Sequence, residues 1–363
     1  MDPDLRVIAG QFEIDGAYVS ASPWGSGHIN DTYVVEFQLG SSAKRFIFQR
    51  INRRVFKDPV GLMANIAAVT GHLRRKVLEA GGDPLRETLT LIPTREASAL
   101  LETDAGECWR SYLFIEGART YDAVERPEHV LAAGRAFGRF QTLLRDLPAG
   151  ELAETIPDFH HTRKRFDAFA QALSEDRLGR AQSARPEIEF VLRREAIASR
   201  LVDMLADGRL PPRITHNDTK LNNVLIDDQT GEGVCVIDLD TVMPGLSLYD
   251  FGDAIRSMGN TGAEDEPDLS KVGFSLEAFD LFTRGYLEFA GSWLEPEELT
   301  LLPLSAELMT LENGMRFLTD YLQGDTYFKT RRPEHNLDRT RTQFKLMQEM
   351  EEVEKQMAVA VRS

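Results

Sequence analysis

The pattern of the chain changes near Ile115, and this change constrains the fold more than any other feature. Before it, short segments rich in β-branched and aromatic residues, such as 32–37 and 45–49, are separated by turn residues, which is typical of strands. After it, apolar residues recur at helical spacing, between Val130 and Leu147 and again from Leu276 onward. The sequence therefore predicts an α+β fold with a β-rich N-terminal part and a mostly helical C-terminal part.

We place the limit between two lobes after Ile115, giving an N-lobe over 1–115 and a C-lobe over 116–363. The N-lobe should hold an antiparallel sheet with strands at 88–92 and 108–115 besides the two above. One helix should begin at Asp58 as N-cap with Pro59 in its first turn, and end before Gly81-Gly82. In the C-lobe, residues 188–205 predict a helix.

Composition excludes several classes of function. The chain has 42 Lys and Arg against 58 Asp and Glu, a net charge of −16, and broad nucleic-acid binding needs a basic surface. A few placed cations or a metal ion can still hold a phosphate. We expect a cytoplasmic protein without a membrane partner. The chain has only two cysteines, its start does not resemble a signal peptide, and it has no long apolar run.

A polar loop at 216–223 lies between short apolar segments. Asp218 follows His216 by two residues and precedes Asn223 by five, which is the spacing of a phosphoryl-transfer catalytic loop. Such chemistry needs a carboxylate facing the attacking hydroxyl and an oxygen ligand facing the metal ion, roles suited to Asp218 and Asn223. The alternative is a polar turn between strands, where Asn and Asp are favoured for local bonding.

An apolar strand predicted at 234–237 ends in two further carboxylates, Asp238 and Asp240. A carboxylate at such a position can bind Mg²⁺ through its oxygens, so Asp238 is the expected principal metal ligand. Asp240 would point to the same side if the backbone stays extended. An ordinary acidic turn would not explain the pairing with the upstream loop.

A later triplet, Asp250-Phe251-Gly252, matches the kinase metal-binding motif in its letters. It follows Pro244-Gly245 rather than a buried strand. We therefore expect Asp250 to support the catalytic loop by hydrogen-bonding its backbone.

Gly25 and Gly27 form a short glycine segment before the first strong strand. Glycines let backbone N–H groups approach phosphate oxygens, although an ordinary hairpin turn is the more common explanation. Asn30 stands where the full Gly-x-Gly-x-x-Gly pattern has its third glycine, so the pattern is incomplete. His28 could touch phosphate or substrate from this loop, or be a polar loop tip.

These motifs together resemble the aminoglycoside phosphotransferase and choline kinase-like superfamily. The matching residues are His216, Asp218, Asn223, the segment 237–240 and Tyr249-Asp250. A closer likeness is to the N-acetylhexosamine 1-kinases, through segments 216–223, 237–245 and 312–322, and more weakly through 48–52 and 324–328.

The resemblance implies a bilobal protein-kinase-like fold with ATP in the interlobe cleft. It implies transfer of the γ-phosphoryl group to the anomeric hydroxyl of N-acetylglucosamine or N-acetylgalactosamine, with Mg²⁺. It assigns Asp218 as the base, Asn223 and Asp238 to magnesium and Arg316 to the sugar. The family's strand cation would be Arg50, unless the register puts Gln49 there. No glutamate occurs between Ile51 and Leu78 to partner that cation from a helix.

Further site hypotheses follow from the same comparison. Phe114 and Ile115 would face the adenine, and Asp240 would accept bonds from sugar hydroxyls. Lys220 would hold the γ-phosphate or be a solvated lysine. Glu312 would join the sugar site or form an i,i+4 ion pair with Arg316 on a wet helix face.

The expected partners are ATP and a small sugar, and the chain should be a monomer or a small homo-oligomer. The alternatives are another small-molecule hydroxyl kinase of the same fold, acting on aminoglycosides, choline or homoserine, and a non-catalytic nucleotide-binding protein.

Overall fold

The structure, a computed structural model, describes residues 4–25 and 29–362. The chain folds into two compact units. The first comprises Met1–Asp122, Leu143–Pro157 and Asn222–Pro244, and the second comprises Ala123–Thr142, Asp158–Leu221 and Gly245–Ser363. The first unit thus includes residues 116–122 and two later segments from beyond Ile115.

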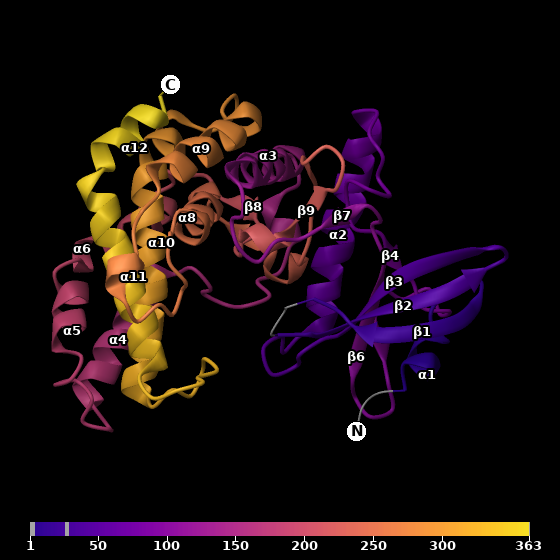
Figure 1. Cartoon of the computed structure of the whole chain (residues 1–363), viewed down its shortest axis with the longest axis horizontal. Coiled ribbons are helices and arrows are strands. Elements are labelled where there is room, and N and C mark those ends of the chain that lie inside the picture. Colours follow the sequence, from indigo (N-terminus) through magenta and orange to yellow (C-terminus); the bar gives the residue numbers. More distant parts are fainter. Residues whose placement is uncertain (1–3, 26–28, 363) are drawn as a thin grey trace. The chain divides into compact units, whose positions relative to one another are not determined.

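The main sheet of the first unit is antiparallel, with strand order β1-β2-β3-β6-β4, and β5 also pairs with β6 (Figure 1). A two-residue hairpin joins β2 to β3, with Leu39 opposite Ser42. The predicted strand at 88–92 is shorter than expected and covers only its last two residues. The bounds are β1 Ala17–Pro23, β2 Asp31–Leu39, β3 Ser42–Arg50, β4 Leu91–Ile92, β5 Leu101–Glu102 and β6 Cys108–Leu113.

One face of this sheet forms a compact aromatic core. Phe12, which follows the short helix α1 (Leu5–Ala9), contacts Phe48 edge to face at 5.1 Å. Val35, Phe48 and Trp109 are each fully buried. Burial of such side chains contributes about 1.5–3 kcal/mol each, so the sheet is a firm platform for polar residues at its other positions.

The predicted helix of the first unit is confirmed as α2 (Pro59–Glu79). Asp58 caps it by accepting the Gly61 N–H at 2.9 Å, and Pro59 lies in its first turn. On its buried face, Asn65 donates to the carbonyls of Ala153 and Val242 at 2.7 and 3.1 Å. The helix is thereby tied to the segment that follows Asp240.

A second, smaller antiparallel sheet in the first unit has the order β10-β9-β7. Its strands are β7 (Ala118–Arg119), β9 (Val224–Asp227) and β10 (Gly233–Val236), and single-turn 3₁₀ helices lie at Ala149–Glu151, Leu221–Asn223 and Leu239–Thr241. Because β9 begins just after Asn223 and pairs with β10, the end of the polar loop is brought beside the start of the Asp238 segment.

The second unit is mostly helical. The predicted single helix at 188–205 is wrong, because the chain breaks into three short helices at Arg194 and Ser199, where the backbone makes turns without side-chain caps. Its elements are α4 Thr162–Glu175, α5 Arg185–Leu192, α6 Glu195–Ala198, α7 Arg200–Ala206, β8 Arg213–Thr215, α8 Ser247–Met258, a 3₁₀ turn Leu269–Lys271, α9 Leu276–Ala290, α10 Pro296–Gln323, α11 His335–Glu352 and α12 Glu354–Ala360. Helix α3 (Pro127–Leu144) lies in this unit except for its last two residues, and only the last residue of β11 (Met243–Gly245) belongs to it.

Helices α3 and α9 approach each other at the level of their backbones. A Cβ atom added at Gly134 or Gly138 of α3 would lie 2.4 Å from the carbonyl oxygen of Phe282 or Tyr286, respectively. One added at Gly285 of α9 would lie 2.5 Å from the carbonyl of Leu131. Only glycine fits at these three positions without moving a helix.

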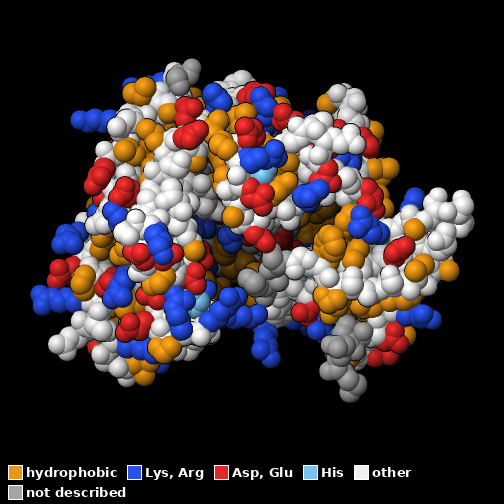
Figure 2. All heavy atoms as spheres, in the orientation of Figure 1, with side chains coloured by type: hydrophobic (Ala, Val, Ile, Leu, Met, Phe, Trp, Pro, Cys, Tyr) orange, Lys and Arg blue, Asp and Glu red, His pale blue; other side chains and the backbone are white. Residues whose placement is uncertain are grey.

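The long helix α10 runs beside α11 through the core of the second unit (Figure 1). The rings of Phe190 on α5 and Phe344 on α11 stack at 4.3 Å in this core. Acidic and basic side chains are mixed over the molecular face in Figure 2, in keeping with the many ion pairs of the chain. Within the described residues, no helix is long and apolar enough to cross a membrane. The predicted α+β class, with an antiparallel N-terminal sheet and a helical C-terminal part, is confirmed.

Candidate active site

The backbone of the predicted catalytic loop is held by two buried aspartates of α8. Asp250 accepts the N–H groups of His216 and Asn217 at 2.9 and 2.7 Å, so the role expected for it is confirmed. Asp253 accepts the N–H of Thr219 at 3.0 Å. The two carboxylates therefore fix the loop on both sides of Asp218.

Asp218 itself stays accessible. Its side chain is 30% exposed, and the Lys220 ammonium lies 2.8 Å from its Oδ1. Burial by itself would raise the pKa of Asp218, but the charge and hydrogen bond of Lys220 lower it overall. The carboxylate is therefore ionised at neutral pH and can accept a proton, and Asp218 raises the pKa of Lys220, which stays a cation.

Two residues beside the predicted site have left-handed backbone conformations. Asn217 has φ 65° and Asp238 has φ 59°. Asn and Asp adopt this region more readily than other non-glycine residues, at a local cost that the surrounding structure must offset. The hydrogen bond from the Asn217 N–H to Asp250 supplies part of that support.

A histidine bridge joins the catalytic loop to α10. His160 contacts Glu312 Oε1 through Nδ1 at 2.8 Å and the carbonyl oxygen of Asn217 through Nε2 at 3.0 Å. Thr162 also donates to Glu312, at 2.5 Å. Glu312 is only 1% exposed, so the alternative of an ion pair on a wet helix face is wrong. The next residue, His161, caps α4 by accepting the N–H of Lys164.

Arg316, one turn beyond Glu312 on α10, lies among aromatic rings and a second arginine. Its guanidinium is 5.4 Å from the ring centre of Phe159 and 5.6 Å from that of Phe328. Arg165 donates to the carbonyl of Phe159 at 2.9 Å, and its pKa is lowered by burial and by the charge of Arg316. Its Nε is buried without a partner among the residues that the structure describes. This corner of the second unit is therefore positively charged and rich in donors.

Asn223 and Asp238, the predicted metal ligands, both belong to the first unit. The N–H of Ile237 donates to the carbonyl of Asn223 at 2.9 Å, which places the residue before Asp238 directly against Asn223. Asn223 is buried, whereas Asp238 is exposed. An amide oxygen and a carboxylate are hard oxygen donors of the kind that Mg²⁺ takes, so the donor set fits the predicted ion.

Asp240 differs from Asp238 in being fully enclosed. Its Oδ1 pairs with Arg110 of β6, and its Oδ2 accepts from Asn30 at 2.6 Å. Arg110 also donates from Nε to Gln49 at 2.9 Å, across the β3–β6 register in which these two residues are opposite each other. Whether Asp240 binds a sugar hydroxyl stays a prediction.

The predicted nucleotide-binding residues all lie in the first unit, where Gly25 has φ 80°. Arg50 is paired with Asp31 and Glu107, at 2.6 Å each. The ring of Phe114 contacts Trp24 edge to face, and Arg45 lies 3.9 Å from its centre. Ile115 is buried, and Gly27 and His28 fall outside the described residues.

Sequence reasoning missed three residues that organise the site. From the sequence, no site role is predicted for His160 or Arg110, and Asn30 is noted only as the residue in place of a third glycine. For Arg110 the sequence carries a signal: a charged residue within the strand 108–113, directly after Trp109, is unusual unless it has a buried partner.

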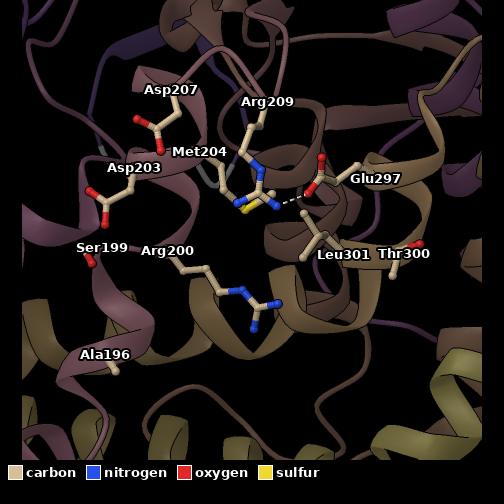
Figure 3. A pocket seen from close by; sticks show the side chains of 10 residues that line it. All are labelled: Ala196, Ser199, Arg200, Asp203, Met204, Asp207, Arg209, Glu297, Thr300 and Leu301. Atoms are coloured by element: carbon tan, nitrogen blue, oxygen red, sulfur yellow. Dashed lines mark hydrogen bonds and ion pairs between the residues drawn. The ribbon is translucent and has the colours of Figure 1, made fainter.

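A pocket of about 400 Å³ lies elsewhere in the second unit, between α6–α7 and the start of α10 (Figure 3). Arg209 bonds Glu297 at its rim. None of the predicted site residues lines this pocket. Its lining residues are Ala196, Ser199, Arg200, Asp203, Met204, Asp207, Arg209, Glu297, Thr300 and Leu301.

The antiparallel sheet, the capped helix and the supported His-x-Asp loop define a protein-kinase-like phosphotransferase fold. A family model described as "Phosphotransferase enzyme family" matches residues 20–281, so the chain belongs to that family.

Solved structures share the fold over almost the whole chain. An aminoglycoside phosphotransferase from Alicyclobacillus acidocaldarius matches with TM-score 0.61 and 13% identity, covering 100% of this chain and 96% of its own. A microcompartment-associated aminopropanol kinase matches with TM-score 0.58 and 16% identity, covering 98% of both chains. Amicoumacin kinase, solved with AMP-PNP and Ca²⁺, matches with TM-score 0.58 and 13% identity, covering 98% and 94%. At these identities the likeness establishes the fold.

Proposed function

We propose that the protein is an ATP-dependent kinase that phosphorylates the anomeric hydroxyl of N-acetylhexosamines to give the sugar 1-phosphate. The observation that carries the proposal is the bridge from Glu312 through His160 to the carbonyl of Asn217. It ties the helix that holds Arg316 to the residue just before Asp218. The predicted sugar-binding arginine and the predicted base are thus connected parts of one unit.

Asp218 acts as the general base in this proposal. It orients the anomeric hydroxyl and accepts its proton as the bond from that oxygen to the γ-phosphorus forms and the bond to the leaving ADP breaks. An anomeric hydroxyl is more acidic than an ordinary alcohol, so an ionised carboxylate of low pKa suffices as the acceptor. Lys220, 2.8 Å away, would neutralise charge on the transferring phosphoryl group.

Asn223 and Asp238 would hold Mg²⁺, which neutralises charge on the phosphates when bound. Gly25, Gly27 and Arg50 are the proposed phosphate contacts, and Phe114 and Ile115 the proposed adenine contacts. Both cysteines, Cys108 and Cys235, are free and buried, which agrees with the proposed cytoplasmic location.

The charge around Arg316 bears on the class of acceptor. Arg165 and Arg316 are close enough to affect each other electrostatically, and a polycationic acceptor would be repelled by them. This disfavours aminoglycosides, which are polycations, and to a lesser degree choline, which carries one positive charge. The donors of Arg165 and Arg316 suit the hydroxyls and the acetamide carbonyl of an N-acetylhexosamine, with His28 as a further proposed sugar contact and Glu312 as the support of the helix. They also suit a carboxylate, so a homoserine-type acceptor is the second candidate.

Turnover of labelled ATP with a panel of acceptors tests the proposal. The panel holds N-acetylglucosamine, N-acetylgalactosamine, glucosamine, homoserine and kanamycin. We expect phosphate transfer to the two N-acetylhexosamines, at the anomeric oxygen. Transfer to homoserine alone would replace the proposed substrate with the second candidate, and no transfer to any acceptor would contradict the proposal.

Arg316→Ala should raise the sugar KM roughly 10- to 100-fold, the loss expected for hydrogen bonds from a charged donor, and leave the KM for ATP nearly unchanged. Arg193→Ala, at an exposed arginine of the same unit, is the matched control. Equal effects of Arg316→Ala on both KM values would count against its placement at the sugar.

A further inference from the structure

The first unit lacks the pairing of a β3 cation with a carboxylate of α2 that protein kinases use, and it contains a different ion pair that is buried. The helix α2 offers no glutamate toward the sheet, since its only one is the terminal Glu79. Arg50, the expected strand cation, is 29% exposed and paired with Asp31 and Glu107. The position of the metal-binding segment must therefore depend on other contacts.

Arg110 and Asp240 provide such a contact. Their side chains are 1% and 4% exposed, which makes this the most deeply buried arginine–aspartate pair among the described residues. Arg110 is held on one side by Gln49 at 2.9 Å, and the second oxygen of Asp240 is held by Asn30 at 2.6 Å. The pair thus links β6, β3 and the residue before β2 to a single carboxylate.

The carboxylate belongs to the turn that carries Asp238. Leu239–Thr241 form one 3₁₀ turn, with Asp238 as its N-cap and Asp240 in its middle. The carbonyl of Asp240 also accepts from Thr155 at 2.9 Å. Because the turn is this short, fixing Asp240 from the side chain and from the backbone fixes the direction in which Asp238 leaves it.

We propose that Arg110 is a positioning residue which, through Asp240, sets the orientation of the metal ligand Asp238. The inference rests on the proposed function, in which Asp238 holds the divalent ion. Partners of metal ligands orient them and tune the affinity, and their removal typically costs about 10- to 100-fold in metal binding.

Electrostatics and energetics agree with this role. Burial by itself would lower the pKa of Arg110, but the charge of Asp240, and less strongly that of Asp238, raises it overall. The guanidinium therefore stays charged beside both carboxylates. A buried ion pair contributes little net stability compared with apolar residues of similar size, so its use here is better explained by the geometry that it imposes.

The test measures binding of a fluorescent ATP analogue to the full chain over a titration of Mg²⁺. The double variant Arg110→Met/Asp240→Leu removes both charges and should remain folded, because no buried charge is left unpaired. We expect the Mg²⁺ concentration for half-maximal binding to rise about 10- to 100-fold, with metal-free binding nearly unchanged. Arg110→Lys keeps the buried charge but loses the planar guanidinium with its paired donors, so it should also raise the Mg²⁺ concentration for half-maximal binding. If the double variant does not fold, Arg110→Lys tests the inference in its place.

Arg86→Met is the matched control, since Arg86 pairs with Asp227 in the same unit without touching Asp240. A Mg²⁺ requirement unchanged in both Arg110 variants would overturn the inference and leave the proposed function intact. An equal loss of binding with and without Mg²⁺ would also overturn it. If the unaltered protein shows no Mg²⁺-dependent nucleotide binding, the proposed function and the inference both fall.

Discussion

Two carboxylate–cation pairs, one in each unit, differ in how far water reaches them. In the second unit, Asp218 and Lys220 lie 2.8 Å apart with 30% and 42% of their side chains exposed. In the first unit, Asp240 and Arg110 are 4% and 1% exposed. Both pairs lie beside predicted functional residues, yet only one is open to a ligand.

The exposed pair can exchange its ionic partner for a ligand, whereas the buried pair keeps its two residues in fixed positions. An exposed ion pair is worth about 0–1 kcal/mol, so a substrate hydroxyl or a phosphate can displace Lys220 from Asp218 at little cost. A buried pair that loses one member leaves a charge without solvation. The accessible Asp218–Lys220 pair is therefore suited to take part in a reaction, and the enclosed Asp240–Arg110 pair is suited to hold neighbouring residues in position.

Replacing the accessible carboxylate gives the largest expected effect. Asp218→Asn keeps the size of the side chain and removes the proton acceptor, so turnover should fall by about 10²- to 10⁴-fold. ATP binding should remain measurable, and the free energy of unfolding should change by no more than about 1 kcal/mol. Steady-state kinetics, calorimetric binding and urea unfolding check these outcomes.

Asp207→Asn, at an exposed aspartate of the same unit, serves as control and should leave turnover unchanged. Near-normal turnover in Asp218→Asn would remove Asp218 from the role of base.

Replacing the aspartate of the enclosed pair by asparagine should instead lower the stability of the fold. Asp240→Asn leaves the buried Arg110 charge uncompensated, which should cost roughly 3–5 kcal/mol in the free energy of unfolding. Urea unfolding of this variant beside Asp218→Asn makes the comparison direct. If the two variants were equally stable, the contrast between an open pair and an enclosed one would not hold.

A third carboxylate, Glu307 of α10, sharpens the comparison because it is buried and no cation among the described residues is bonded to it. Burial, and then the charges of Glu354 and Glu351, raise its pKa to about 7, against the opposing effect of Arg194 and Arg200. Its Oε1 has no hydrogen-bond partner among the described residues.

The native state should therefore keep a proton on Glu307 that the unfolded chain releases near its ordinary pKa of 4.5. The resulting stability is complete below pH 4.5 and is lost as the pH rises to about 7, by at most roughly 3 kcal/mol. Glu307→Gln should reduce this decline, so its advantage over the unaltered protein should grow between pH 5 and 8. Parallel stability curves from urea unfolding would contradict the assignment.

The sequence was sufficient where local chemistry decides structure. The β2–β3 hairpin, the Asp58 cap of α2 and the support of the loop by Asp250 were predictable because each depends on turn residues or on a motif of fixed spacing. The helical segment after Arg185 was mispredicted, because apolar spacing does not reveal the turns at Arg194 and Ser199.

Residues that act over long sequence distances were not predictable. His160 meets Glu312 and the carbonyl of Asn217 only after α4, α8 and α10 have packed. Arg110 of β6 meets Asp240 across 130 residues of sequence, in a 3₁₀ turn that belongs to neither β3 nor β6. No recognisable sequence spacing links His160 or Arg110 to its partner. A single sequence therefore shows at most that a charged residue occupies a buried strand.

The glycine contacts between α3 and α9 have a consequence for the rate of the reaction. Gln141 lies one turn beyond Gly138 on α3; it accepts from the Tyr286 hydroxyl of α9 at 2.5 Å and donates to Asp250 at 2.6 Å. A single added methyl group at this crossing would displace the amide that steadies Asp250. In the proposed kinase, we therefore expect catalytic speed to respond to ångström-scale shifts at a helix crossing that contains none of the predicted site residues.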